Sequence, residues 1–321
     1  MGVTAVELAR QLLEVAPLLE CCLGSGVVSC TSRFPPPAVA LGLCLAVAAL
    51  SFLWARLCDN YSKVDQLWSL MPAAYAWLLL ALRPGPSTEP HRRGLLVCGL
   101  VSLWSLRLTY NFWLKGGYGN LIRHEEDHRW PVLRRLIGSP ALFALFNLTF
   151  IAGFQNLLLL LIALPVHGVL LGSPRIEAVD WLLAAVFLLL LCLEAAADHQ
   201  HWVFQSKKRS LSPEERALHP DRDIREGFYQ SGLFRFSRHP NYFAEQAMWV
   251  VVFLFSVDWA AGAAELLSPL GVGSLLLVLL FQGSMAFGEW ISGSKYEAYK
   301  NYQRRTSQCI PWPPLQRDKL D

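Results

Sequence analysis

Long apolar stretches without charged side chains dominate the pattern along this chain. Residues 34–55 and 266–288 contain no Asp, Glu, Lys or Arg, and residues 136–174 form a longer stretch of the same kind. About 20 residues of helix cross the hydrocarbon core of a bilayer, so each stretch is long enough to span it. A soluble helical domain of this size would need several helices that are apolar on every side, which argues against that class.

The pattern therefore predicts an all-α fold, a polytopic membrane helix bundle with about seven transmembrane spans. The connection between the last two spans is short, so these two should form a helical hairpin. The expected spans are residues 36–55, 66–82, 94–112, 140–164, 178–197, 242–257 and 266–287.

The residues before the first span have a different character. Glu7, Arg10 and Glu14 interrupt an apolar pattern, and no basic start precedes an apolar core as in a cleaved signal peptide. We expect residues 1–34 to contain an amphipathic helix that lies on the membrane surface or packs on the bundle. Residues 35–321 should form a single membrane domain.

Basic residues are concentrated on one side of the predicted spans. Most of the 28 Lys and Arg residues lie in the connections that follow odd-numbered spans, and few lie in the others. By the positive-inside rule, this bias predicts a cytoplasmic C-terminus and a lumenal position for residues 1–34.

The cysteines and histidines do not indicate a metal site. The eight cysteines are scattered without CxxC spacing, and no HxxxH or HExxH pattern lies on a span together with a third ligand. We expect the cysteines to be reduced and to act as small buried hydrophobic residues.

The segment LFRFSRHPNYFAEQAMW gathers polar groups at the start of the sixth span. Pro240 can begin the helix, and Asn241 and Glu245 lie four residues apart and share a face. A helix N-terminus with Arg235 and Arg238 beside it is typical of an anion site. The alternative is an interfacial anchor, which explains the arginines but gives no reason for a glutamate inside a span.

The chain ends in a polar segment with regularly spaced tyrosines. Tyr296, Tyr299 and Tyr302 recur every third residue after Lys295, which puts rings and hydroxyl groups on one helix face. Such a face suits the base and phosphates of a nucleotide. A helix that lies on the membrane surface is an equal alternative.

Further polar residues lie at the end of the fifth span. Glu194 and Asp198 are one turn apart, and His201 and Gln205 continue the same stripe. Two carboxylates near the inner end of a span need partners or water.

The first half of the chain has polar residues in two spans. Asp65 and Gln66 lie at the start of the second span, and Arg107 and Tyr110 lie in the third. An arginine within a span needs a carboxylate partner, so a purely structural pair of Arg107 and Asp65 stays open beside a role in substrate binding.

These residues resemble motifs of the steroid 5α-reductase C-terminal superfamily, most closely its branch named only as a domain of unknown function. The resemblance covers roughly residues 60–314. Its most specific parts are SRHPNYFAE and the ending YQRRTS with IPW. The weaker matches are VDQLW, RLTYNFW, EEDHRW and ADHQHWVF.

The resemblance implies a multi-span reductase of the endoplasmic reticulum membrane that uses NADPH to saturate a carbon–carbon double bond. An apolar lipid, steroid or sterol-like substrate would enter from the bilayer, and membrane lipids but no nucleic acid would be further partners. Residues 178–314 would hold the cofactor. The expected cofactor-binding residues are Asp198, Phe234, Arg238, Asn241, Tyr242, Glu245, Lys295, Tyr296 and Tyr302.

For catalysis, the nearest equivalents of the family's residues are Asp65 or Gln66 for an acidic or amide group and Tyr110 for a tyrosine that polarises the substrate carbonyl. Hydride transfer to the β-carbon leaves an enolate, which a donor at the oxygen stabilises.

One departure concerns the cofactor phosphates. Relatives place a Lys and an Arg where this chain has His201 and Gln205, so Lys207 or Arg209 would have to replace them. Two other functions stay open: a membrane methyltransferase of the isoprenylcysteine or phospholipid type, which uses S-adenosylmethionine and also carries an RHPxY element, and a non-catalytic member. Asn241 in RHPNY and the TSQCIPW ending favour the reductase.

Overall fold

The computed structural model describes residues 3–83, 90–118, 126–127 and 129–315. All regular elements in these ranges are helical, which confirms the predicted all-α fold. The chain divides into two compact units. Unit 1 contains residues 1–185 and 249–277, and unit 2 contains residues 186–248 and 278–321.

Among the described residues, five helices are long and apolar enough to cross a membrane, so the chain has the character of a membrane protein. The expected second and sixth spans correspond to shorter helices. The second is divided because Pro72 starts a new helix, α6 (Met71–Ala81), after α5 (Lys63–Trp68). The sixth is the 16-residue helix α15 (Pro240–Phe255). The five long helices are α4 (Pro36–Cys58), α7 (Arg92–Leu114), the run Pro140–Leu171, α12 (Ala178–Ser210) and the run Pro269–Lys295.

The N-terminal residues, where an amphipathic helix was expected, form three short helices. Leu8 is buried in a cluster with Leu164, and the Oε1 atom of Gln11 lies 3.1 Å from Nε2 of His167. The first helix therefore packs on unit 1. The three helices are α1 (Ala5–Leu13), α2 (Val15–Ser25) and α3 (Val27–Thr31).

Cys21 and Cys30 form a disulfide between α2 and α3, which corrects the expectation that all cysteines are reduced. The spacing of these residues gave no sign of the bond, since the short helices must fold back on each other before the thiols can meet. The other six cysteines are free.

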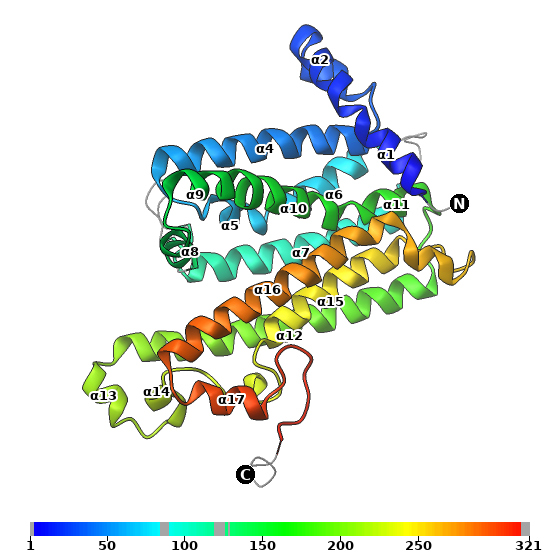
Figure 1. The fold of residues 1–321 in the computed structure, drawn as a ribbon. Helices are drawn as coiled ribbons and strands as arrows, with labels where there is room; N and C mark the ends of the chain where they lie inside the picture. Colours follow the sequence, from blue (N-terminus) through cyan, green and yellow to red (C-terminus); the bar gives the residue numbers. More distant parts are fainter. Residues whose placement is uncertain (1–2, 84–89, 119–125, 128, 316–321) are drawn as a thin grey trace. The chain divides into compact units, whose positions relative to one another are not determined.

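The centre of unit 1 is the helical run Pro140–Leu171, the most deeply buried of the long apolar helices. Its second piece, η1 (Asn147–Phe154), is a π-helix. The third piece, α10 (Gln155–Ala163), packs against α4 and α6 (Figure 1). The first and last pieces are α9 (Pro140–Phe146) and α11 (Pro165–Leu171).

A buried ion pair holds three helices together in unit 1. The Nε atom of Arg93 in α7 donates to Oδ1 of Asp180 in α12 at 2.8 Å. One terminal nitrogen of the same guanidinium donates to the carbonyl oxygen of Phe255 in α15 at 2.6 Å. Unit 1 also contains α8 (Arg129–Ile137), η3 (Ala263–Leu267) and η4 (Pro269–Gly271).

Unit 2 is built around the ends of long helices. The 33 residues of α12 correspond to a length of about 50 Å, more than the ~30 Å of a bilayer core, so the helix must extend beyond the hydrocarbon. This extension carries the polar stripe of the fifth span into unit 2. The remaining elements are α13 (Pro213–Ala217), α14 (Arg222–Glu226), η2 (Gly232–Arg235), α16 (Val272–Lys295) and α17 (Tyr299–Arg305).

Candidate functional site

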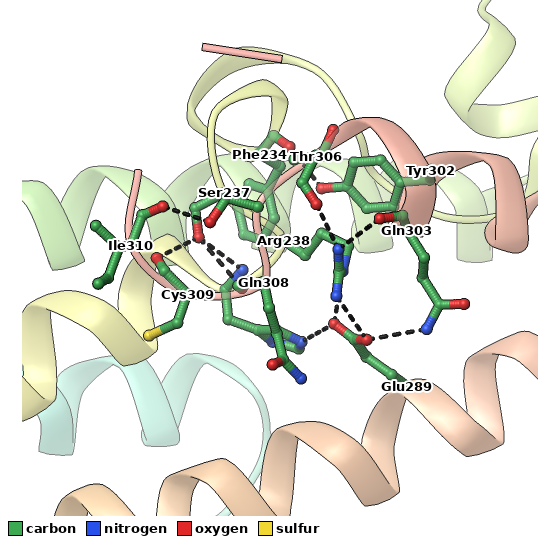
Figure 2. A network of polar contacts seen from close by, with 12 residues as sticks. Phe234, Ser237, Arg238, Glu289, Tyr302, Gln303, Thr306, Gln308, Cys309 and Ile310 are labelled. Carbon is green, nitrogen blue, oxygen red and sulfur yellow. Dashed lines mark hydrogen bonds and ion pairs between the residues drawn. The ribbon is translucent and has the colours of Figure 1, made fainter. Parts of the chain in front are cut away.

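The two most specific sequence motifs meet in unit 2. The loop before α15 pairs with the segment after α17: the backbone N–H of Arg238 donates to the carbonyl of Ser307 at 2.8 Å, and that of His239 to Gln308 at 3.1 Å. The backbone N–H of Trp312 donates back to the carbonyl of Phe236 at 2.9 Å. The RHPNY motif and the C-terminal motif are therefore two sides of one structure (Figure 2).

Arg238 is the centre of this structure. Its Nε and one terminal nitrogen donate to the two carboxylate oxygens of Glu289 at 2.7 and 2.9 Å. The other terminal nitrogen donates to the carbonyl oxygens of Gln303, at 2.9 Å, and of Thr306. Four of its five N–H groups thus bind protein (Figure 2). This geometry favours a role as a structural clamp over the phosphate contact expected for Arg238.

Glu289 gathers a second set of donors around its carboxylate. Nε2 of His239 lies 3.0 Å from one oxygen, and Nε2 of Gln303 donates to the other at 2.9 Å. The carboxylate side chain is 6% exposed and the Arg238 side chain 9%, so the pair is buried. Sequence reasoning did not assign Glu289 to the site, although a glutamate at the end of an apolar span was a signal for it.

Tyr302 lies in the core of unit 2. Its hydroxyl donates to the carbonyl oxygen of Phe234 at 2.5 Å, and its ring stacks on Phe228. Burial raises the pKa of Tyr302 above its ordinary value. The hydrogen bond of the Tyr302 hydroxyl fixes η2, which contains Phe234. The ring of Phe234 in turn stacks on His201 of α12. Tyr302 and Phe234 thus shape the site from within, whereas the sequence suggested direct cofactor contacts.

Two lysines approach one tyrosine at the edge of this core. The Nζ atom of Lys208 donates to the hydroxyl oxygen of Tyr296 at 2.9 Å and to the carbonyl oxygen of Gly227 at 2.5 Å. The Nζ atom of Lys295 lies 5.3 Å from the centre of the same ring. Gly227 has a φ of +84°, and a Cβ there would lie 2.6 Å from Cε1 of Tyr296, so glycine is required for this approach.

Lys208 is the basic residue of α12 that reaches the site. The sequence suggested Lys207 or Arg209 for this role, but both side chains are exposed, and Lys208 is the one with contacts in the site. The helical stripe of Glu194, Asp198, His201 and Gln205 continues three residues on to Lys208, so the spacing contained the signal.

The two lysines change the acidity of Tyr296. Burial acts to raise its pKa, but the hydrogen bond and charge of Lys208, followed by those of Lys295, bring the pKa of Tyr296 below the ordinary value of about 10. A lysine ammonium stabilises the negatively charged phenolate, so the proton leaves at a lower pH.

We therefore expect Tyr296 to ionise at lower pH than the buried Tyr299 and Tyr302, whose pKa values are raised by burial. The phenolate absorbance should be measured during a pH titration of the wild type and of Tyr296→Phe. The wild type should show one ionisation step below about pH 10 that is missing from the titration curve of Tyr296→Phe. The same early transition in both proteins would contradict the assignment.

A polar stripe joins α12 and α15 within unit 2. The side-chain nitrogen of Asn241 donates to Oδ1 of Asp198 at 3.3 Å. Glu245 lies one turn after Asn241 in α15, and Glu194 lies one turn before Asp198 in α12. Both glutamates are buried. The structure therefore joins the two helix faces that the spacing had predicted, through the contact of Asn241 with Asp198.

The remaining predicted cofactor residues lie around this stripe and the clamp. The ring of Tyr242 meets the edge of Phe281 at a centroid distance of 4.8 Å and stacks on His239 at 5.2 Å. Lys295 is exposed beside Tyr296. Tyr242 thus packs among aromatic rings, whereas the Lys295 side chain remains exposed to solvent.

The predicted catalytic residues lie in unit 1, where Asp65 belongs to a local cluster. Nε1 of Trp130 donates to Oδ2 of Asp65 at 3.3 Å. Burial raises the pKa of the Asp65 carboxyl, and the charge of Arg129 opposes this rise. The pair of Arg107 with Asp65 stays a prediction beside these contacts of Asp65.

Gln66 follows Asp65 in α5, and Tyr110 lies in α7. The side-chain nitrogen of Gln66 donates to the carbonyl oxygen of Gly117 at 2.8 Å, which fixes a loop. Tyr110 is 59% exposed and stacks on Trp113. None of the described contacts brings Tyr110 to Asp65 or Gln66.

Comparison with known proteins identifies the family. The chain matches the family described as "Protein of unknown function (DUF1295)" over residues 51–306. It is similar to "Uncharacterized protein C594.04c" of Schizosaccharomyces pombe, with 34% identity over 279 residues that cover 84% of this chain and 79% of the relative. No solved structure was found that matches the chain. Since the matched residues include most of the chain, among them the RHPNY motif, the protein belongs to the DUF1295 family.

Proposed function

We propose that this protein is a membrane-embedded reductase that uses NADPH to saturate a carbon–carbon double bond in an apolar lipid, steroid or sterol-like substrate. The observation that carries the proposal is the approach of Lys208 and Lys295 to Tyr296 beside an aromatic core. Two ammonium groups next to aromatic rings can bind the phosphates and the base of a nucleotide. The resemblance to steroid 5α-reductases in the two motifs that form this site supports the same reading.

The residues present fit the cofactor chemically. Lys208 and Lys295 offer N–H donors and positive charge for phosphate groups, which replaces the lysine and arginine missing at His201 and Gln205. Asn241 offers an amide that can bind a carboxamide. NADPH, when bound, supplies the hydride for the reduction.

Charge also separates the reductase from the methyltransferase alternative. S-Adenosylmethionine carries a positively charged sulfonium, whereas NADPH carries several negative phosphate charges. A site whose rim contains Lys208, Lys295 and Arg305 favours the anionic cofactor.

The substrate would reach the protein from the bilayer. Tyr110 is accessible on the outside of unit 1 and remains the proposed donor to the substrate carbonyl. Such a donor stabilises the enolate that forms when hydride adds to the β-carbon. In this proposal Asp65 and Gln66 position the loops near the start of the second span.

The proposed setting is the endoplasmic reticulum membrane, with the C-terminus and the loop of residues 211–239 between α12 and α15 in the cytoplasm. The excess of Lys and Arg on that side supports this topology. The disulfide between Cys21 and Cys30 supports a lumenal N-terminal segment, since disulfides persist in oxidising compartments. Seven spans follow if the shorter helices α6 and α15 also cross the membrane.

The proposal is tested by ligand-dependent stability. Purified protein in detergent should show a higher melting temperature with NADPH than with NADH or S-adenosylmethionine, because a ligand that binds only the folded state stabilises it. Stabilisation by S-adenosylmethionine alone would establish the methyltransferase class. No shift with any of the three would indicate a non-catalytic member.

A further inference from the structure

Three amide side chains are buried in the central helix of unit 1. Asn147 and Asn156 have no exposed surface, and Gln155 is 5% exposed. Among the described residues, both amide atoms of Asn147 and the side-chain oxygens of Gln155 and Asn156 have no hydrogen-bond partner. A polar group that is buried without a partner is strongly unfavourable, and more so in a membrane that offers no water.

The π-helix η1 changes the directions in which Asn147 and Asn156 are expected to point. In an α-helix, nine residues make about two and a half turns, so Asn147 and Asn156 would point in opposite directions. The i→i+5 hydrogen bonds of a π-helix wind the chain more slowly, and nine residues then make about two turns. Such segments are rare and are frequent at functional sites.

Gly153 makes this winding possible. A Cβ at that position would lie 2.7 Å from the carbonyl oxygen of Leu148, five residues earlier in the same helix. A backbone oxygen cannot move aside easily, so any larger residue would disturb the π-helix. The rare backbone form and the unpartnered amides therefore depend on one glycine.

A ladder of aromatic rings follows the same helix. Phe146 and Phe150 stack with their centroids 5.1 Å apart, and Phe150 and Phe154 with theirs 5.6 Å apart. These rings are partly buried, and Phe146 and Phe150 also pack against a core cluster that includes Phe143 and Ile151. Amide groups and aromatic rings on one helical run match a molecule with a hydrocarbon body and one polar group.

We infer that these buried amides bind the hydroxyl or carbonyl oxygen of an apolar lipid, at Asn147 or, about two turns further along the helix, at Gln155 and Asn156. An amide can both donate and accept hydrogen bonds, so it suits either group. The site stands independently of the proposed reductase activity, because it rests on unit 1 and on no cofactor contact.

The test uses two pairs of photoreactive probes. One pair is a diazirine sterol with its 3-hydroxyl group and the same sterol without it. The other pair is a long-chain diazirine ketone and the corresponding alkane. Labelling of the full-length wild type, of Asn147→Leu/Asn156→Leu and of Gly153→Ala should be compared in membranes. Thr149→Val is the matched control, since Thr149 lies on the exposed side of η1.

The wild type and the control should prefer the oxygen-bearing member of at least one pair by about tenfold, and both other variants should lose this preference. The double variant should melt at the same or a higher temperature than the wild type, because leucine removes unpartnered polar groups. If it cannot be purified, Asn147→Leu alone makes the same comparison. No oxygen preference in either pair, or an unchanged preference in the variants, would overturn the inference.

Discussion

Replacement of Glu289 by leucine is expected to destabilise the folded protein by about 3–5 kcal/mol, the range for breaking a buried ion pair. The Arg238 guanidinium would remain buried without its counter-charge, and the hydrogen bonds of His239 and Gln303 to the carboxylate would also be lost. The loop before α15 and the C-terminal segment should separate more easily. Thermal unfolding in detergent measures the effect.

Two further variants isolate the charge as the cause. Glu297→Leu removes a glutamate that is exposed near the same end of α16, and its melting temperature should stay close to that of the wild type. Arg238→Met/Glu289→Leu removes both charges and should be less unstable than Glu289→Leu alone. Equal melting temperatures for Glu289→Leu and the wild type would show that Arg238 does not depend on Glu289.

Replacement of Lys208 by methionine should weaken NADPH binding by about ten- to hundredfold, as expected for the loss of a charge-assisted hydrogen bond. Lys208 is held between Gly227 and Tyr296, so its ammonium is already positioned before a ligand binds. Titration of the purified protein with NADPH, at two salt concentrations, gives the affinity and its electrostatic part.

Lys207→Met is the matched control because it removes the same charge from the exposed neighbouring position. Its affinity for NADPH should change less than twofold or so, as expected for an exposed charge. Equal losses in the two variants would mean that overall charge, not the position of Lys208, governs binding. Unchanged affinity in Lys208→Met would remove this residue from the proposed site.

Much of the candidate site followed from helical spacing. Asn241 and Glu245, and Glu194 and Asp198, were placed on shared faces because residues four apart are neighbours on any α-helix. Helical spacing could not predict that the two faces touch through Asn241 and Asp198, because this contact depends on how α12 packs on α15. The same stripe included Lys208. Because Lys207 and Arg209 beside it are also basic, residue type alone did not show which of the three side chains reaches the site.

The roles of Arg238 and Tyr302 could not be read from the sequence. Both residues have side chains that bind nucleotides in other settings, and both lie in the most specific motifs. Their hydrogen bonds are instead used within the protein, with Glu289 and with the carbonyl of Phe234. These partners lie 51 and 68 residues away along the chain, beyond any local pattern.

Apolar run lengths and charge bias were sufficient to establish a helical membrane protein, because transfer of side chains into a bilayer depends on local composition. The division of the second span at Pro72, the disulfide between Cys21 and Cys30 and the π-helix at Asn147 emerged only from the folded chain. Each depends on which segments pack together, and packing depends on contacts between residues that are distant along the chain.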